Sequence, residues 1–426
     1  MIDIYGREWL EKEYLDLLAK KLITEAQIEK VAAISHHTCQ RCFNQDRLWI
    51  GIFKYQGAKI CYCRKCLDFG MMTNQMKLYR SVLIPKIAPY AGQLAADFQL
   101  SPLQQRASDF TKGILNNNDQ GMIWAVCGAG KTEMMFEAIS EALKQGRRVC
   151  WAIPRADVVV ELLPRLKAAF PQALVIGLHG RSDEKQQYGD IVITTVHQMI
   201  RFYQAFSFLI IDEVDAFPYT FDEMLPRLAK RACRDRCATI YLSATPSSKD
   251  QRLIKKGKLK CCLIPSRYHL QPLDIPQFKW SSYFKKWILN KVKQNRRALL
   301  FVPTINNGHQ LKERLAKELK LTVDFVYSSD EQRLEKVQKF KEGKGQFLIT
   351  TMILERGVTI VDIDVGILGA EHEVYEESAL VQISGRVGRS PKYPHGDIVF
   401  FHTGITKAMV DARNQIRRMN QLALKE

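Results

Sequence analysis

Short apolar runs of strand length alternate with amphipathic stretches between about residue 100 and residue 245. The runs predict strands over residues 120–126, 148–153, 173–177, 190–194, 206–211 and 238–242. The amphipathic stretches predict a helix over Lys131–Lys144 and another that follows the second strand and continues through Leu163. Strands and helices that alternate in this way form a parallel sheet covered by helices on both faces.

The same alternation resumes from about residue 281 to residue 410 and predicts a second α/β domain. Its predicted strands cover residues 298–302, 323–326, 346–350, 365–368 and 397–401. A last helix is expected over Thr406–Leu424. Residues 247–280 break the pattern with several prolines and the lysine-rich stretch Lys255–Lys260. We therefore expect them to form an inter-domain segment.

The N-terminal hundred residues carry a different pattern. Leucines and alanines at helical spacing from Trp9 to Ala33 predict a helical start. Residues 70–96 also look mostly helical, with interruptions at Pro85 and Pro89. Between these stretches, residues 47–54 alternate like a strand, and the chain returns after a short turn at Lys59. This predicts a hairpin.

Five of the eleven cysteines cluster around that hairpin. Cys39 with Cys42, and Cys63 with Cys66, form two Cys-x-x-Cys knuckles with twenty residues between them. Two knuckles supply the four thiolates of a structural zinc ribbon, whereas one alone would also fit a redox pair or chance. Cys61 has a less suitable spacing and is left out of the predicted zinc ligands.

A chain of 426 residues is too long for one core. The predicted fold class is α/β, with two parallel-sheet domains preceded by a zinc-ribbon module and helices. The expected parts are an N-terminal helical segment, 1–36; the four-cysteine ribbon, 37–68; a helical linker, 69–98; the first α/β domain, 99–248; the inter-domain segment, 249–280; and the second α/β domain, 281–426.

Charge narrows the class of partner. The 63 basic and 45 acidic residues give a net charge of +18, which favours nucleic acid or an anionic membrane surface. No apolar run reaches the roughly 18 residues of a transmembrane helix. The acidic start of the chain lacks the features of a signal peptide. A cytoplasmic protein with at most peripheral membrane contact is expected.

A phosphate loop lies between a predicted strand and a predicted helix. Gly128 and Gly130 let the backbone approach the phosphates, so that successive N–H groups face the anion. Lys131 is expected to reach the β- and γ-phosphates, and the Thr132 hydroxyl to bind Mg²⁺. The strict motif has glycine where this chain has Ala125. The residues expected to bind ATP here are Ala125, Val126, Cys127, Gly128, Ala129, Gly130, Lys131 and Thr132.

Acidic and basic candidates for catalysis follow. Asp212 and Glu213 come directly after the apolar run at 206–211, where they can hold the metal and activate water respectively. On its own, such a pair would also fit an exposed turn. Arg386 and Arg389 are of the kind that stabilise charge on the transferred phosphate. The alternative for these arginines is a salt-bridged helix cap.

The ordered set of motifs resembles that of superfamily 2 helicases and translocases over about residues 100–405. The resemblance implies two RecA-like domains that hydrolyse ATP, with Gln104 reading adenine and Gly357 adding to the ATP site. It also implies that Ser243, Thr245 and Gln382 couple hydrolysis to movement. The positions implied to contact the nucleic-acid backbone are Pro154, Arg155, Thr194, Thr195 and Thr351.

A narrower resemblance is to the ComFA family of competence ATPases. It is carried by the four-cysteine module ahead of the motor, the stretch Asp212–Pro218 and the overall length. It implies ATP, Mg²⁺ and Zn²⁺ as cofactors, and a motor at the inner face of the membrane that pulls single-stranded DNA through a channel. The implied partners are the channel protein, the operon partner ComFC and DprA, a recombination mediator. The helicase PriA is related, but its zinc cysteines interrupt the motor.

Three functions remain open at this point. The leading hypothesis is a DNA-stimulated ATPase that translocates on single-stranded DNA during natural transformation. A PriA-like or other DNA helicase, or an RNA helicase, would use the same motifs. In the third hypothesis the chain is a nucleic-acid-binding scaffold whose ATPase acts only as a switch.

Overall fold

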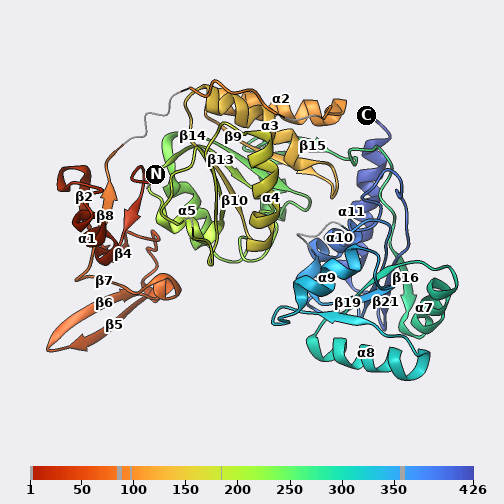
Figure 1. Ribbon diagram of the computed structural model, residues 1–426. Coiled ribbons are helices and arrows are strands. Elements are labelled where there is room, and N and C mark those ends of the chain that lie inside the picture. The colour runs from red at the N-terminus through yellow and green to blue at the C-terminus, as the bar shows by residue number, and fades with distance from the viewer. Residues whose placement is uncertain (1–2, 84–88, 96–97, 184, 356–359) are drawn as a thin grey trace. The chain divides into compact units, whose positions relative to one another are not determined.

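The computed structural model describes residues 3–83, 89–95, 98–183, 185–355 and 360–426 (Figure 1). The chain forms two compact units. The first unit comprises residues 1–123 and 132–262, and the second comprises residues 124–131 and 263–426.

A seven-stranded sheet organises the first unit, in the order β11-β12-β10-β13-β14-β9-β15. The strands are β9 (Gln120–Ala125), β10 (Val149–Ile153), β11 (Val175–Leu178), β12 (Ile191–Thr195), β13 (Phe206–Ile211), β14 (Cys233–Ser243) and β15 (Lys260–Ile264). The pairs from β11 to β14 are parallel. The helices are α2 (Pro102–Asn117), α3 (Lys131–Lys144), α4 (Ala156–Ala169), α5 (Met224–Ala232) and α6 (Ser248–Lys255). The parallel sheet predicted from the apolar runs is therefore present.

The second unit holds a six-stranded parallel sheet in the order β16-β21-β20-β17-β19-β18. The strands are β16 (Gln277–Trp280), β17 (Ala298–Phe301), β18 (Asp324–Val326), β19 (Phe347–Thr350), β20 (Asp364–Leu368) and β21 (Ile398–His402). The helices are α7 (Phe284–Lys293), α8 (Ile305–Leu319), α9 (Arg333–Lys341), α10 (Glu377–Ser384) and α11 (Lys407–Ala423).

Alternate residues of β17 enter two different cores of this second sheet. Leu299 and Phe301 pack in a core that includes residues of α9, α10 and α11. Ala298 and Leu300 pack in a core that includes residues of α7 and α8. Because side chains along a strand point alternately to opposite faces, helices cover both faces of the sheet.

The N-terminal module is mainly β-structure, and the prediction of a helical start was wrong except over α1 (Glu11–Ala19). Three small sheets have the strand orders β1-β8-β2, β3-β4 and β5-β6-β7. Their strands are β1 (Glu8–Trp9), β2 (Ile28–Ala32), β3 (Ile34–Ser35), β4 (Thr38–Cys39), β5 (Ile50–Tyr55), β6 (Ala58–Cys63), β7 (Met72–Thr73) and β8 (Lys77–Ser81). The predicted hairpin corresponds to β5 and β6.

Long-range pairing explains the wrong prediction of helix. Strand β2 pairs with β8, about fifty residues further along the chain, from Ile28 with Ser81 to Ala32 with Lys77. A sequence window around β2 does not contain its partner, so helical spacing of leucines dominated the pattern. The predicted helical linker was also wrong, because the described residues from 70 to 98 contain β7 and β8 and no α-helix.

Buried ion pairs join the N-terminal module to the large sheet within the first unit. Asp3 pairs with Arg7 at 2.9 Å and with Arg148 at 2.6 Å. Glu8 pairs with Arg80 at 2.8 Å and also with Arg231. These six residues are called the Asp3–Glu8 network below. Every side chain in it is at most 6% exposed, and burial lowers the pKa of Arg7 to about 10.

The segment expected between the domains contains regular structure. Strand β15 joins the first sheet and β16 joins the second, with α6 before them. The sequence pattern did not predict these two short strands, because prolines and lysines interrupt the apolar positions around them. Among the described residues, no helix combines the length and the apolar character needed to cross a membrane.

Candidate active site

The phosphate loop connects β9 to α3. Gly128 and Gly130 have φ angles of +81° and +77°, which residues with a Cβ rarely adopt. Ala125 is instead the last residue of β9, fully buried and without a positive φ. The departure from the strict motif therefore falls where the backbone has no need of glycine. Lys131 and Thr132 begin α3, whose free N–H groups suit a phosphate.

The acidic pair lies at the end of β13. The Asp212 N–H donates to the Ala152 carbonyl of β10 at 2.9 Å, which fixes the backbone at this edge of the sheet. The Glu213 N–H donates to Asp212 Oδ1 at 2.8 Å, and Glu213 has a φ of +52°. A non-glycine residue in this region is uncommon and often marks a functional site.

Asp215 links the acidic motif to β14. Its carboxylate accepts hydrogen bonds from Ser243 Oγ at 2.9 Å and from Thr245 Oγ1 at 2.7 Å, and all three residues are buried. The Thr245 N–H also donates to Ser243 Oγ at 3.0 Å. Sequence reasoning gave a coupling role to Ser243 and Thr245 but no role to Asp215. The available signal was the pair of hydroxyl groups of Ser243 and Thr245 just after a predicted strand. Two such hydroxyls need a hydrogen-bond acceptor, and Asp215 is that acceptor.

Gln104 has a local structural partner. Its side-chain oxygen accepts from the Ser101 N–H at 2.9 Å, and Ser101 Oγ accepts from the Gln104 N–H at 3.4 Å. This reciprocal pair is the capping box of α2. The structure therefore holds the Gln104 side chain at the start of α2. Its contact with adenine remains a prediction.

The positions expected to contact nucleic acid in the first unit lie at one edge of the sheet. Strands β10 and β12 pair with Ile153 opposite Thr195, so Pro154 and Arg155 follow β10 beside the end of β12. Thr194 and Thr195 are 0% and 7% exposed. Arg155 pairs with Asp157 at 2.8 Å. Backbone N–H groups are therefore better placed than the two threonine hydroxyls to meet a phosphate.

The arginine motif lies at the end of α10. Arg386 is 2% exposed and its Nε donates to the Glu355 carbonyl at 3.1 Å. Arg389 Nε donates to the Gly385 carbonyl at 3.0 Å. Gln382 Oε1 accepts a hydrogen bond from Cys127 Sγ at 3.0 Å within the second unit. Thr351 follows β19 and precedes a 3₁₀ turn, whereas Gly357 lies outside the described residues.

Two residues that sequence reasoning missed hold the arginine motif. Arg267 is 1% exposed and donates to the carbonyls of Val387 at 2.6 Å and Gly388 at 2.8 Å. The His269 ring lies 3.0 Å from the Gly388 carbonyl oxygen. Burial lowers the pKa of both side chains. Neither carries a sequence signal, because their carbonyl partners are about 120 residues away.

The four predicted zinc ligands come together in the N-terminal module. Cys39, Cys42, Cys63 and Cys66 are fully buried, and their sulfur atoms lie within 4.8 Å of one another. The Cys39–Cys66 and Cys42–Cys63 sulfur distances are 3.7 and 3.6 Å. Four thiolates about 2.3 Å from a tetrahedral zinc ion are about 3.8 Å apart, so the donor set fits such an ion. Cys61 is not part of the cluster.

Hydrogen bonding within the cluster lowers the pKa of the Cys39 and Cys63 thiols and raises the pKa of the Cys42 and Cys66 thiols. Contacts from Cys39, Cys42 and Cys66 lower the pKa of the Cys63 thiol well below its ordinary value. Cys39 ends β4, which pairs with β3, and Cys63 ends β6, so the ends of two short strands hold one cysteine of each knuckle. The hairpin supports the cluster as the sequence predicted.

Three family models match successive parts of the chain. The N-terminal domain of competence protein ComFA matches residues 3–80. The res subunit of type III restriction enzymes matches residues 97–248, and the helicase conserved C-terminal domain matches residues 282–391. The matched ranges contain the cysteine cluster, the phosphate loop with Asp212, and the arginine motif respectively.

Similar proteins cover most of the chain. Competence protein ComFA of Bacillus subtilis (strain 168) is 41% identical over 405 residues, which span 91% of this chain and 87% of that protein. ComFA of Streptococcus pneumoniae is 35% identical, with 99% of each chain covered. The solved structure of S. cerevisiae Dbp5 bound to RNA and ADP BeF3 shares the fold, with a TM-score of 0.55 at 17% identity over 75% of this chain and 91% of that one.

Helicase-type domains, the phosphate loop between strand and helix, and long similarity to two curated relatives agree with one another. The chain therefore belongs to the ComFA family of competence proteins and is a helicase-type ATPase of superfamily 2.

Proposed function

We propose that the chain is an ATP-dependent motor that translocates on single-stranded DNA and drives DNA uptake during natural transformation. The observation that carries the proposal is the buried bonding of Asp215 to Ser243 and Thr245. These bonds tie the turn that holds Asp212 and Glu213 to the end of β14. A change at the acidic pair when ATP is cleaved is thereby transmitted to a second strand of the sheet.

The chemical roles follow from side-chain type and position. Lys131 neutralises charge on the β- and γ-phosphates. Thr132 and Asp212 are the residues that would hold Mg²⁺, which screens the phosphate charge when bound. Glu213 accepts a proton from the attacking water, and Arg386 and Arg389 stabilise the charge that develops in the transition state.

Zinc in the cysteine cluster is part of the proposal. Its support is the tetrahedral spacing of the four buried sulfur atoms. The role is structural, because four protein ligands leave no open position for a substrate. The module is small and made of short strands, so a bound ion would contribute much of its stability.

The place of action and the partners rest on family membership. The motor works in the cytoplasm at the inner face of the membrane, with only peripheral membrane contact. Its partners are a channel protein, ComFC and DprA. The six parts 1–36, 37–68, 69–98, 99–248, 249–280 and 281–426 are retained as functional divisions, with the secondary structure of the N-terminal parts corrected as above.

Steady-state ATP hydrolysis tests the proposal most directly. The rate should rise strongly with single-stranded DNA at low salt, and less with duplex DNA or RNA. Equal stimulation by RNA would favour the RNA-helicase alternative. Absence of any stimulation by DNA would refute the motor. A protein roadblock on the strand separates a motor from a switch, because only a motor displaces it in an ATP-dependent manner.

Lys131→Ala should abolish ATP turnover, because the phosphates lose their main cationic partner. Binding of single-stranded DNA should remain close to that of the wild type. Lys144→Ala is the matched control, since Lys144 ends the same helix α3 and is exposed. Turnover that survives in Lys131→Ala would show that the phosphate-loop assignment is wrong.

A further inference from the structure

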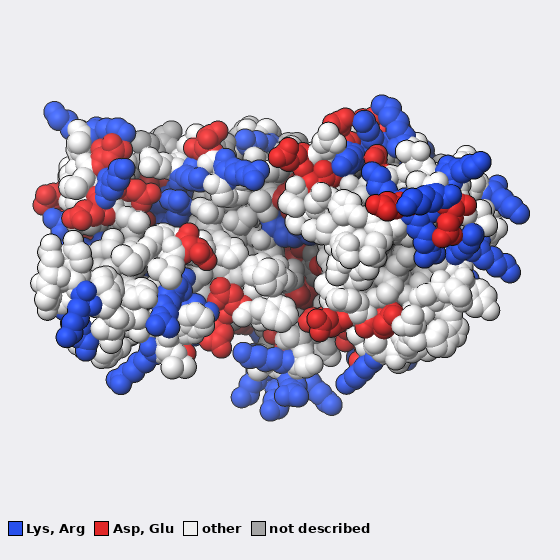
Figure 2. Space-filling model, turned by 90° about the horizontal axis from the view of Figure 1, so that it is seen from below, with Lys and Arg blue, Asp and Glu red and all other residues white. Residues whose placement is uncertain are grey.

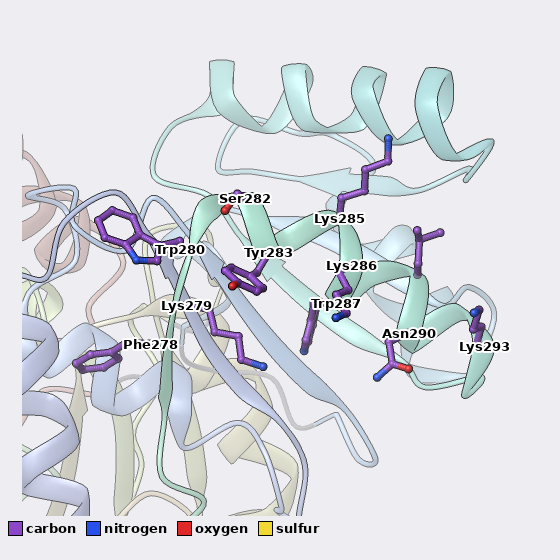
Figure 3. Close-up of a pocket in the computed structure, with 11 residues that line it drawn as sticks. Phe278, Lys279, Trp280, Ser282, Tyr283, Lys285, Lys286, Trp287, Asn290 and Lys293 are labelled. Carbon is purple, nitrogen blue, oxygen red and sulfur yellow. The ribbon is translucent and has the colours of Figure 1, made fainter.

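A groove in the second unit lies between β16 and α7. It has a volume of about 990 Å³. Phe278, Lys279 and Trp280 line it from β16, and Tyr283, Lys286 and Lys293 lie on the 3₁₀ turn and helix that follow (Figure 3). None of the motif residues described above lies in it.

Two large aromatic rings at this groove are open to solvent. Trp280 is 57% exposed and Tyr283 is 53% exposed, whereas Trp287, which also lines the groove, is only 6% exposed. The Trp280 ring is supported from one side by the His402 ring at 5.1 Å. Exposed aromatic rings that come in a pair beside a groove are typical of a surface that binds a ligand.

The charge around these rings has one sign. No Asp or Glu occurs between residues 275 and 312, and no acidic residue lines the groove. Lys285 pairs with Glu318 at 3.1 Å. Lys279, Lys286 and Lys293, in contrast, have no ion-pair partner within the described ranges. Figure 2 shows that, on the face it presents, basic side chains gather in several clusters and that most of these clusters have acidic side chains nearby.

The sheet places the groove on the same edge as a motif expected to contact DNA. The ends of neighbouring strands pair with one another across the sheet from β16 to β19, and the sheet is parallel, so these ends lie along one edge. The paired residues are Trp280 with His402, Phe401 with Leu368, Ile367 with Phe301, and Phe301 with Thr350. Thr351 follows Thr350 at this edge. Four strand spacings of about 4.8 Å separate β16 from β19, or about 19 Å.

We propose that the β16–α7 groove binds single-stranded DNA, with bases stacked on Trp280 and Tyr283 and phosphates beside Lys279, Lys286 and Lys293. This inference rests on the proposed function. Aromatic rings interleaved with lysines bind single strands without regard to sequence, because every base has a π-face. A translocating motor needs that property. An acidic peptide would use the lysines but would leave the two rings without a role.

Two variants test the two halves of the groove. Trp280→Ala/Tyr283→Ala removes the rings, and Lys279→Gln/Lys286→Gln/Lys293→Gln removes the charges. Binding is measured by the fluorescence anisotropy of labelled oligothymidine between about 50 and about 200 mM salt. The aromatic variant should bind about tenfold more weakly or worse. The lysine variant should lower the slope of log affinity against log salt by about 2, since each phosphate contact contributes about 0.7 for a single strand.

A matched control removes the same charge elsewhere in the second unit. Lys317, Lys339 and Lys344 are surface lysines, each within 3.9 Å of a carboxylate. Their triple change to Gln should leave the salt slope at the wild-type value. Trp280→Phe keeps a ring and should retain most of the affinity. It should also lose the part of the tryptophan fluorescence that oligothymidine quenches in the wild type.

The outcomes separate this inference from the proposed function. Wild-type melting temperatures in both variants show that the fold is intact. If DNA stimulates the wild-type ATPase and the aromatic variant still binds oligothymidine normally, the groove proposal is overturned and the motor stands. The groove proposal is also overturned if the lysine variant loses binding while the aromatic variant keeps it, because base stacking on the rings would then contribute nothing to the affinity. If DNA does not stimulate the wild type, the motor itself fails, whatever the groove binds.

Discussion

The Asp3–Glu8 network and the β16–α7 groove use positive charge in opposite ways. In the network, Arg7, Arg80, Arg148 and Arg231 are buried, and each forms an ion pair with Asp3 or Glu8. In the groove, Lys286 and Lys293 are exposed and Lys279 is partly exposed, and none of the three has an ion-pair partner among the residues described. Each of these arginines and lysines counts as one positive charge toward the net charge of +18. Burial and pairing, rather than the sum, decide which charges can attract a polyanion.

The largest loss of stability should come from removing the cysteine cluster. The four cysteines belong to the same hydrophobic core as Phe202 and Phe206, whose rings contact Arg7 and Arg148 of the network. Cys39→Ser/Cys66→Ser should reduce bound zinc from about one ion per chain to none and open the N-terminal module to proteolysis, since structural zinc contributes roughly 10 kcal/mol or more in small domains. Metal analysis measures this. Cys61→Ser is the control and should keep its zinc. Stoichiometric metal in the double variant would exclude the proposed ligands.

Asp3→Asn should destabilise the first unit by about 3–5 kcal/mol, because it leaves buried Arg7 and Arg148 without their counter-charge. Denaturant unfolding, monitored by hydrogen exchange in the N-terminal module, measures this loss of stability. Asp16→Asn is the control, since Asp16 pairs with Lys20 at 2.8 Å but both side chains are more than half exposed. It should change stability by less than about 1 kcal/mol. Equal losses of stability in the two variants would show that the buried ion pairs of the network contribute no more than an exposed ion pair.

Thr245→Val should give an intermediate effect. It deletes one hydrogen bond to the buried Asp215 carboxylate, which is worth about 1.5–3 kcal/mol for a charged acceptor. It should also weaken the stimulation of ATP hydrolysis by DNA. Thr245→Ser retains a hydroxyl and should restore both stability and stimulation. A valine variant with normal stimulation would show that this bond serves only the fold.

The smallest effect on stability should come from the groove. Lys279→Gln/Lys286→Gln/Lys293→Gln should change the free energy of unfolding by no more than about 0.5 kcal/mol per residue, because exposed side chains away from buried contacts contribute little. Urea unfolding measures it. A loss of several kcal/mol would mean that these lysines support the fold, and the contrast with the network would then fail.

Local patterns were sufficient for the strands of the two large sheets other than β15 and β16. The apolar run predicted at 206–211 is strand β13, and the predicted helix Lys131–Lys144 is α3. Such runs are read correctly because a buried parallel strand is apolar along its whole length. The cysteine knuckles were equally readable, since their spacing alone sets which thiolates can meet.

Elements that depend on distant partners could not be predicted in this way. Ile28–Ala32 became a strand because β8 pairs with it. Asp215 gained its partners only when β13 and β14 were aligned in parallel. Arg267 binds carbonyls about 120 residues away. In each case the decisive contact lies outside any window of sequence.

The sequence by itself determined that this chain has a phosphate loop, an acidic pair, an arginine motif and four clustered thiols, because each depends on residues close together along the chain. Only the tertiary structure decided which charges are buried and which face solvent. Arg148 and Lys286 look alike in the sequence as basic residues, yet one is 1% exposed beside Asp3 and the other lines an open groove. Burial is a property of the folded chain as a whole, because it depends on residues that only folding brings together.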